Sequence, residues 1–131
     1  MSQQPFPIQS VEKPILCSPF KEPARHWSYR CGMPEIVPYR RPASCRYNTE
    51  EVYISQMDMF GEEQREDLSL INALREDVKR WRDSGYEGAT EITKELLHYW
   101  QRADRERRLF FCQAEAVATI IYLTEIRLAG K

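Results

Sequence analysis

Apolar residues recur along the second half of the chain with the spacing of helix faces. From Glu66 onward they return at steps of three and four, which places them on one side of an α-helix. The first such face consists of Leu68, Ile71, Leu74, Val78 and Trp81. Gly85 follows this face and is typical of a helix stop. The pattern therefore predicts a helix from about Glu66 to just before Gly85.

Two further helices are predicted after Gly85. Thr90 can cap a helix that runs to about Arg102. The apolar side of this helix would be Ile92, Leu96, Tyr99 and Trp100. Asp104 can cap a third helix from about Arg105 to Leu128. Because the third helix is apolar over most of its circumference, we expect it to be buried in something larger than its two neighbours.

The first turn of the third predicted helix carries three arginines, Arg105, Arg107 and Arg108. The helix dipole favours negative charge at this end, so the arginines oppose it. An anionic partner would offset this charge, but arginines that extend into water are the favoured interpretation.

Residues 1–60 predict a different structure, an irregular arm rich in proline. Seven of the eight prolines lie between Pro5 and Pro38. Proline lacks an N–H and restricts the preceding residue, so this density prevents long helices. Aromatic residues in the arm favour packing on another surface over disorder, and Glu51–Ile54 has short strand character. The predicted fold is mainly α: an arm over residues 1–60 and a three-helix segment over residues 61–131.

Charge and composition limit the classes of function. A formal net charge of −1 argues against a general polyanion binder, and 131 residues suit one domain with a loose extension. Residues 16–47 are nevertheless locally basic. Arg25, His26 and Trp27 could contact nucleic acid there, although packing within the fold is the favoured interpretation.

We expect a cytoplasmic protein without membrane insertion, because no signal peptide and no apolar run of ~18–20 residues is visible.

No metal site is predicted. The cysteines, Cys17, Cys31, Cys45 and Cys112, form no CxxC pair, which is the spacing typical of zinc sites. We expect free thiols in a reducing compartment, with Cys112 as a small core residue. No catalytic residue is predicted either.

Several motifs together resemble a known family. Tyr99-Trp100 is followed by Arg105-Glu106-Arg107-Arg108-Leu109-Phe110-Phe111-Cys112-Gln113-Ala114-Glu115-Ala116 and by Ile121-Tyr122-Leu123-Thr124-Glu125. Upstream lie Ser18-Pro19-Phe20, Pro23, Arg25-His26-Trp27, Arg40-Arg41-Pro42 and Arg80-Trp81-Arg82 with Gly85-Tyr86. From about Pro14 onward the chain thus resembles the N-terminal region of superfamily 2 DEAD/DEAH-box helicases and of restriction (Res) subunits of type III restriction enzymes. The Arg-rich lead into Phe-Cys-Gln-x-Glu-Ala is the most specific part.

The resemblance implies an α/β motor that uses ATP and Mg²⁺, with this chain as its leading segment. It assigns Gln113 to adenine recognition. A carboxamide has a donor and an acceptor side by side, which match the N6 and N7 edge of adenine. The implied partners are a downstream motor domain or subunit, DNA and a methyltransferase subunit. Phe110 or Phe111 could contact the base, although both suit a core by their spacing.

The chain departs from that family in lacking its catalytic motifs. It contains no G-x-x-x-x-G-K-[ST] phosphate loop, no Asp-Glu-x-His box for magnesium and no Pro-Asp…Glu-x-Lys nuclease motif. We expect no ATP hydrolysis, unwinding or cleavage by this chain alone. It is expected to be the N-terminal fragment of an ATP-dependent DNA helicase-like protein or type III restriction endonuclease subunit, a hydrolase. The alternative is a stand-alone, non-enzymatic helical module that binds a protein or DNA partner.

Overall fold

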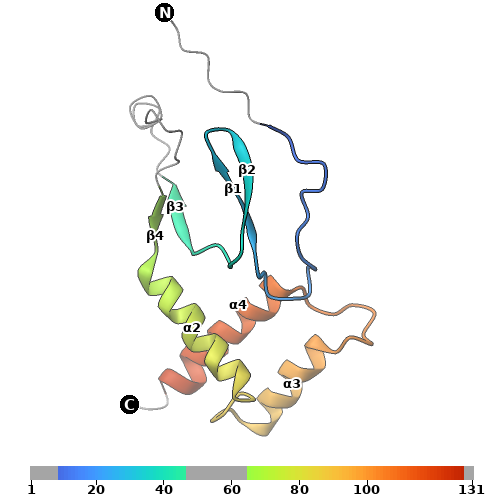
Figure 1. Ribbon diagram of the computed structural model, residues 1–131. Helices are drawn as coiled ribbons and strands as arrows, with labels where there is room; N and C mark the ends of the chain where they lie inside the picture. Colours follow the sequence, from blue (N-terminus) through green and yellow to red (C-terminus); the bar gives the residue numbers. More distant parts are fainter. Residues whose placement is uncertain (1–8, 47–64, 129–131) are drawn as a thin grey trace, which may run out of the picture. The chain divides into compact units, whose positions relative to one another are not determined.

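The computed structural model describes residues 9–46 and 65–128 (Figure 1). The chain forms two compact units. The sheet unit comprises Met1–Cys17 and Pro23–Leu68, and the helical unit comprises Ser18–Glu22 and Ser69–Lys131.

The sheet unit contains two small antiparallel sheets. Their strands are β1 (His26–Arg30), β2 (Met33–Val37), β3 (Ser44–Arg46) and β4 (Arg65–Asp67). In the first sheet β1 pairs with β2, so that Trp27 lies opposite Ile36 and Tyr29 opposite Pro34. In the second, β3 pairs with β4.

A two-residue turn closes the first hairpin. Cys31 and Gly32 both have positive φ angles, of 51° and 77°, as the type I′ turn of a tight hairpin requires. Glycine adopts this conformation freely, whereas Cys31 is a rare residue at such a position.

The prediction of an irregular arm is wrong for these strands, and the mainly α fold is only partly confirmed. Pro34 lies within β2, which local rules disfavour. Both strands of a two-stranded sheet have an unpaired side, however, and proline is tolerated at such edges. The predicted strand character of Glu51–Ile54 lies outside the described residues.

The helical unit contains three helices near the predicted positions, although the first begins at Ser69 and not at about Glu66, because Glu66 pairs within β4. They are α2 (Ser69–Asp83), α3 (Glu91–Gln101) and α4 (Phe111–Ile121), and α4 continues as the π-helical segment η1 (Tyr122–Arg127). The predicted stop after α2 is confirmed, because Gly85 has a φ of 76°. The predicted cap of α3 is confirmed as well, since Thr90 Oγ1 accepts the Thr93 N–H at 3.3 Å. The predicted apolar side of α3 is wrong, because Ile92, Leu96 and Tyr99 are exposed and the residue buried against the other helices is Leu97.

The predicted start of the third helix is wrong by about six residues. Asp104 does not cap a helix, because its carboxylate accepts two hydrogen bonds from the Arg102 guanidinium, at 3.0 and 2.6 Å. These bonds lower the pKa of Asp104. Arg105 and the residues up to Phe110 form a non-helical connection, and α4 begins at Phe111.

The core of the helical unit lies where α2, α3 and α4 meet. Its buried residues are Val78, Trp81, Tyr86, Ala89, Leu97 and Ala118. Trp81 stands at its centre, with ring centroids 5.0 Å from Tyr86 and 5.5 Å from Tyr122. Its indole N–H donates to the Glu87 carbonyl at 2.9 Å, so the one polar atom of the ring is satisfied.

The expectation that α4 is buried on all sides is not met within the described residues. Ala118 is its single buried residue, and Ile120 on another side of the helix is 63% exposed. Cys112, predicted as a core residue, is exposed as well. No described helix is both long and apolar enough to cross a membrane.

Candidate functional site

The site suggested by the sequence lies at the amino end of α4. Phe110 precedes the helix in an extended conformation, with φ −65° and ψ 157°. The Oε1 atom of Gln113 reaches back and accepts the Phe110 N–H at 3.0 Å. This is the glutamine half of a capping box, and it satisfies one backbone donor that the helix itself leaves unpaired.

The Gln113 side chain is exposed on the first turn of α4, although the apolar sequence that follows it is typical of a buried helix. Its hydrogen bond to Phe110 has a useful consequence. A backbone N–H can be met only by the carboxamide oxygen, so this bond fixes which end of the amide is Oε1 and which is Nε2. The Nε2 donors therefore remain on the side away from Phe110. Recognition of adenine by this group stays a prediction.

A five-residue segment of the predicted arm, Ser18–Glu22, packs on the same end of α4. The Phe111 N–H donates to the Pro19 carbonyl at 2.8 Å. The rings of Phe20 and Phe110 lie 5.4 Å apart between centroids. A second backbone donor at the start of the helix is thus satisfied by a partner that is distant in sequence.

Glu22 anchors the other end of this segment to α2. Its carboxylate lies 3.1 Å from the Arg82 guanidinium and 3.7 Å from the Lys79 ammonium. We call Ser18–Glu22 the strap. Sequence reasoning predicted packing of the arm in general terms but did not find the strap, because no local spacing connects it to α4.

The arginines before α4 are arranged differently from the prediction. They precede the helix and so do not occupy its first turn. The Arg105 guanidinium lies 4.3 Å from the centroid of the Tyr99 ring, and that of Arg108 lies 3.8 Å from the centroid of Phe20. Each distance is well within the range of a cation–π contact.

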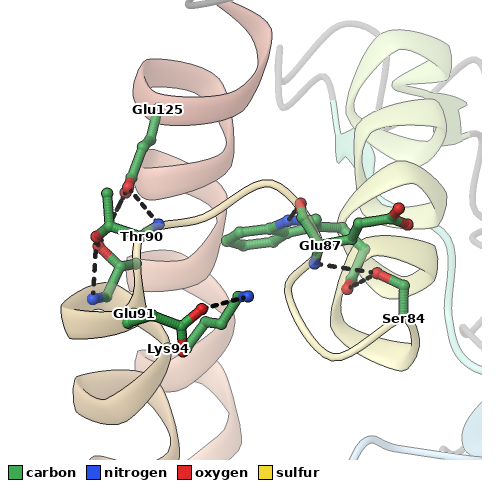
Figure 2. A network of polar contacts seen from close by, with 8 residues as sticks. Ser84, Glu87, Thr90, Glu91, Lys94 and Glu125 are labelled. Atoms are coloured by element: carbon green, nitrogen blue, oxygen red, sulfur yellow. Dashed lines mark hydrogen bonds and ion pairs between the residues drawn. The ribbon is translucent and has the colours of Figure 1, made fainter.

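A polar network holds η1 to the start of α3 (Figure 2). The Glu125 carboxylate accepts the Thr90 N–H at 3.0 Å and the Thr93 hydroxyl at 3.0 Å. These hydrogen bonds, led by that from the Thr90 backbone, lower the pKa of Glu125. The carboxylate is thus a second cap of α3, beside Thr90 itself.

Arg25, His26 and Trp27 of the sheet unit make hydrogen-bond contacts with backbone carbonyls of the same unit, and their contact with nucleic acid stays a prediction. His26 Nδ1 lies 2.7 Å from the Tyr39 carbonyl. The Trp27 indole N–H donates to the Pro14 carbonyl at 2.9 Å, and Arg25 donates to the Leu16 carbonyl at 3.2 Å. These bonds tie the leading residues to β1.

A shallow surface pocket of about 360 Å³ opens elsewhere on the helical unit. Its walls are Asp77, Arg80, Trp81, Ser84, Glu87, Gly88 and Tyr122. None of these residues was singled out as a candidate site, and Asp77 is already paired with Arg80 and, at 3.8 Å, with Arg127.

Across residues 9–46 and 65–128, no three His, Cys, Asp or Glu side chains gather as metal ligands. No protein-family model matches the chain, and no curated protein or solved structure is detectably similar to it.

Proposed function

We propose that the chain is the leading segment of an ATP-dependent, helicase-like DNA motor of superfamily 2, such as a type III restriction subunit. Gln113 reads the adenine ring of ATP. The phosphates and Mg²⁺ bind to a motor domain or subunit that adjoins this segment. The chain supplies adenine recognition and an accessory arm, and it performs no catalysis of its own.

The observation that carries this proposal is the exposed and oriented amide of Gln113. A residue that reads a base edge must be accessible and must present its donor and acceptor in a fixed order. Gln113 is exposed on the first turn of α4, and its Oε1 is held by the Phe110 N–H at 3.0 Å. The Arg-rich lead and the Phe-Cys-Gln-x-Glu-Ala motif surround the same turn.

The orientation of this amide predicts a preference for adenine over guanine. Oε1 has a second lone pair that can accept the N6–H of adenine, while Nε2 donates to N7. Guanine presents the O6 acceptor where adenine has the N6 donor. That oxygen would face Oε1, so GTP would lose one hydrogen bond and gain a repulsion.

The uncovered side of α4 is consistent with a large partner. Cys112, Ala116 and Ile120 recur four residues apart, are all exposed, and carry no charge. Exposure of such an apolar helix side to water is unfavourable. Burial of this surface would contribute about 25 cal/mol of favourable free energy per Å². In the proposed assembly the adjoining motor domain covers it.

Two substitutions of Gln113 separate its roles as cap and as base reader. Gln113→Glu keeps an oxygen that accepts the Phe110 N–H, since glutamate also serves in capping boxes. It removes the Nε2 donor that would meet N7. Gln113→Ala removes both functions. The test compares ATP and GTP binding by the full-length encoded protein in its wild-type, Gln113→Glu and Gln113→Ala forms.

We expect Gln113→Glu to weaken ATP binding by roughly 5- to 30-fold, the equivalent of about 1–2 kcal/mol for one base contact. GTP binding should weaken as well, because guanine also presents N7 to the lost Nε2 donor, whereas the melting temperature should stay close to that of the wild type. If Gln113→Glu binds ATP as tightly as the wild type, Gln113 does not read adenine and the proposal is wrong.

The alternative function, a stand-alone helical module that binds a protein or DNA, is favoured by the same uncovered side of α4. Ile120 is 63% exposed, and a partner protein could cover it without any nucleotide. Sedimentation of the isolated chain distinguishes the two. A monodisperse species that captures a partner without nucleotide supports the module, whereas concentration-dependent aggregation supports a segment that needs its motor domain.

A further inference from the structure

The connection between α3 and α4 carries two arginines that each stack on an aromatic ring. The guanidinium of Arg105 lies over Tyr99, and that of Arg108 over Phe20, at the distances given above. The Leu109 N–H donates to the Trp100 carbonyl at 3.2 Å. This bond holds the backbone next to Arg108 against the backbone next to Tyr99.

The aromatic rings of this surface remain accessible. Tyr99 is 48% exposed, Phe110 46% and Phe20 38%. Phe110 extends the surface because its ring packs against Phe20. We call this set, with Arg107 exposed between the stacked arginines, the arginine–aromatic cluster: Phe20, Tyr99, Arg105, Arg107, Arg108 and Phe110.

The nearby carboxylates are largely occupied by other cations. Asp104 is held by Arg102 through two hydrogen bonds. Glu22 lies against Lys79 and Arg82. Among the described residues, no carboxylate is recorded within ion-pair distance of Arg105 or Arg108, although the charge of Arg105 helps to lower the pKa of Asp104. Glu106 offsets only part of their charge, so the cluster carries an excess of positive charge on a chain whose net charge is −1.

A stacked arginine is well suited to bind phosphate. Stacking engages one face of the guanidinium but leaves its N–H donors in the plane of the group. The ring also holds the side chain in place, which reduces the entropy lost when a ligand binds. The outer face of the guanidinium can stack on a nucleobase, as can an exposed ring.

We propose that the arginine–aromatic cluster binds single-stranded nucleic acid. Arg105 and Arg108 contact successive phosphates, and unpaired bases stack on the guanidinium planes and on the exposed rings. A duplex would offer phosphates but not base faces, so the cluster prefers a single strand. This site differs from the adenine contact of Gln113, and its use requires no nucleotide.

The test is fluorescence anisotropy of a labelled oligothymidine of about 12 nucleotides, within the ~4–16 nucleotides of known single-strand sites. The full chain is titrated at several salt concentrations without nucleotide. The test variant is Arg105→Gln/Arg108→Gln. The matched control is Arg30→Gln/Arg127→Gln, which removes the same charge from two exposed positions outside the cluster. Thermal melts confirm that both variants fold.

We expect the test variant to bind about tenfold more weakly or worse, and the control to change less than about twofold. Loss of two phosphate contacts should reduce the slope of log K against log salt by about 1.4. An abasic strand of equal length should bind more weakly than oligothymidine, because it offers no bases to stack.

Three outcomes would overturn the proposal. The first is equal binding by the test variant and the wild type. The second is an equal loss in the control variant, which would show that only net charge matters. The third is displacement of the strand by ATP but not by inorganic triphosphate, because the cluster would then serve a nucleotide. None of these depends on whether Gln113→Glu alters ATP binding.

Discussion

The carboxylate of Glu125 caps the amino end of α3 by accepting the Thr90 backbone N–H at 3.0 Å. The two residues are 35 positions apart, and Figure 2 shows Glu125 reaching from η1 to the turn that begins α3. Thr90 thus donates its own backbone N–H to Glu125 while its side chain caps the Thr93 N–H. Glu125 thus links η1 to the start of α3.

Replacement of Glu125 by alanine should loosen this link. We expect Glu125→Ala to lower the melting temperature by a few degrees, because two donors at the start of α3 lose their acceptor. Glu125→Gln should lose less, since its amide oxygen can still accept the Thr90 N–H. Thermal unfolding by circular dichroism measures both, and equal melting temperatures for wild type and Glu125→Ala would show that water replaces the carboxylate without loss.

Stability should also depend on the ionisation of Glu125. The pKa of this carboxyl is lower in the folded protein than its ordinary value of 4.5, because the Thr90 N–H and the threonine hydroxyls favour the charged form. Its contribution is therefore fully present above pH 4.5 and is lost as the pH falls through the lowered pKa. Wild type should lose more stability than Glu125→Gln between pH 5 and about pH 3. Parallel pH profiles of denaturant midpoints for the two proteins would contradict this.

The centre of the helical unit should be the least tolerant part of the chain. Leu97 is 1% exposed and lies on α3 where the helices meet. Leu97→Ala should cost about 2–5 kcal/mol, because it removes buried surface and leaves a cavity. Leu70→Ala is the matched control, since Leu70 is largely exposed on α2, and should cost less than about 0.5 kcal/mol. Urea denaturation measures the free energy of unfolding of both variants. Equal losses in Leu97→Ala and Leu70→Ala would show that Leu97 is not a core residue.

Gly85 should resist substitution for a reason of backbone conformation alone. Its φ is +76°, and a Cβ built there would meet nothing within 4 Å. Gly85→Ala should thus cost about 1–2 kcal/mol from the left-handed conformation without any steric clash. Gly85→Asn should cost less, because asparagine tolerates this region. If alanine and asparagine are equally destabilising in urea denaturation, backbone conformation is not the cause.

The existence of α2 and α3 was predictable because their end signals are local: Gly85 ends the first and Thr90 caps the second, as the structure confirms. The buried side of α3 was not predicted, because Leu97 is buried while Ile92 and Leu96 are exposed. The start of α4 was missed because Asp104 resembles a cap, yet Arg102 takes its carboxylate. The true start at Phe111 is set by Gln113 and by the carbonyl of Pro19, a contact across more than ninety residues that no local pattern reveals.

The strands were missed for a related reason. The β1–β2 hairpin turns at Cys31 and Gly32, where asparagine or aspartate before glycine would have been recognisable. The pairing of β3 with β4 joins Cys45 to Glu66, and periodicity within a three-residue strand is too short to detect. At the candidate site, the family resemblance alone pointed to Gln113, and only the structure shows that its amide is exposed and accepts the Phe110 N–H.

The strap offers a further test of how the amino end of α4 is held. Phe20 packs on Phe110 and lies under the Arg108 guanidinium, which keeps the neighbouring Pro19 carbonyl against the Phe111 N–H. Phe20→Ala should release the strap, at a cost of about 1–3 kcal/mol because this ring is only partly buried. Hydrogen exchange of the Phe111 amide should become faster, while amides around Leu97 keep their protection. Ile15→Ala, at a residue 85% exposed in the sheet unit, should change neither. Unaltered exchange of the Phe111 amide in Phe20→Ala would mean that the strap is held by Glu22 and the backbone alone.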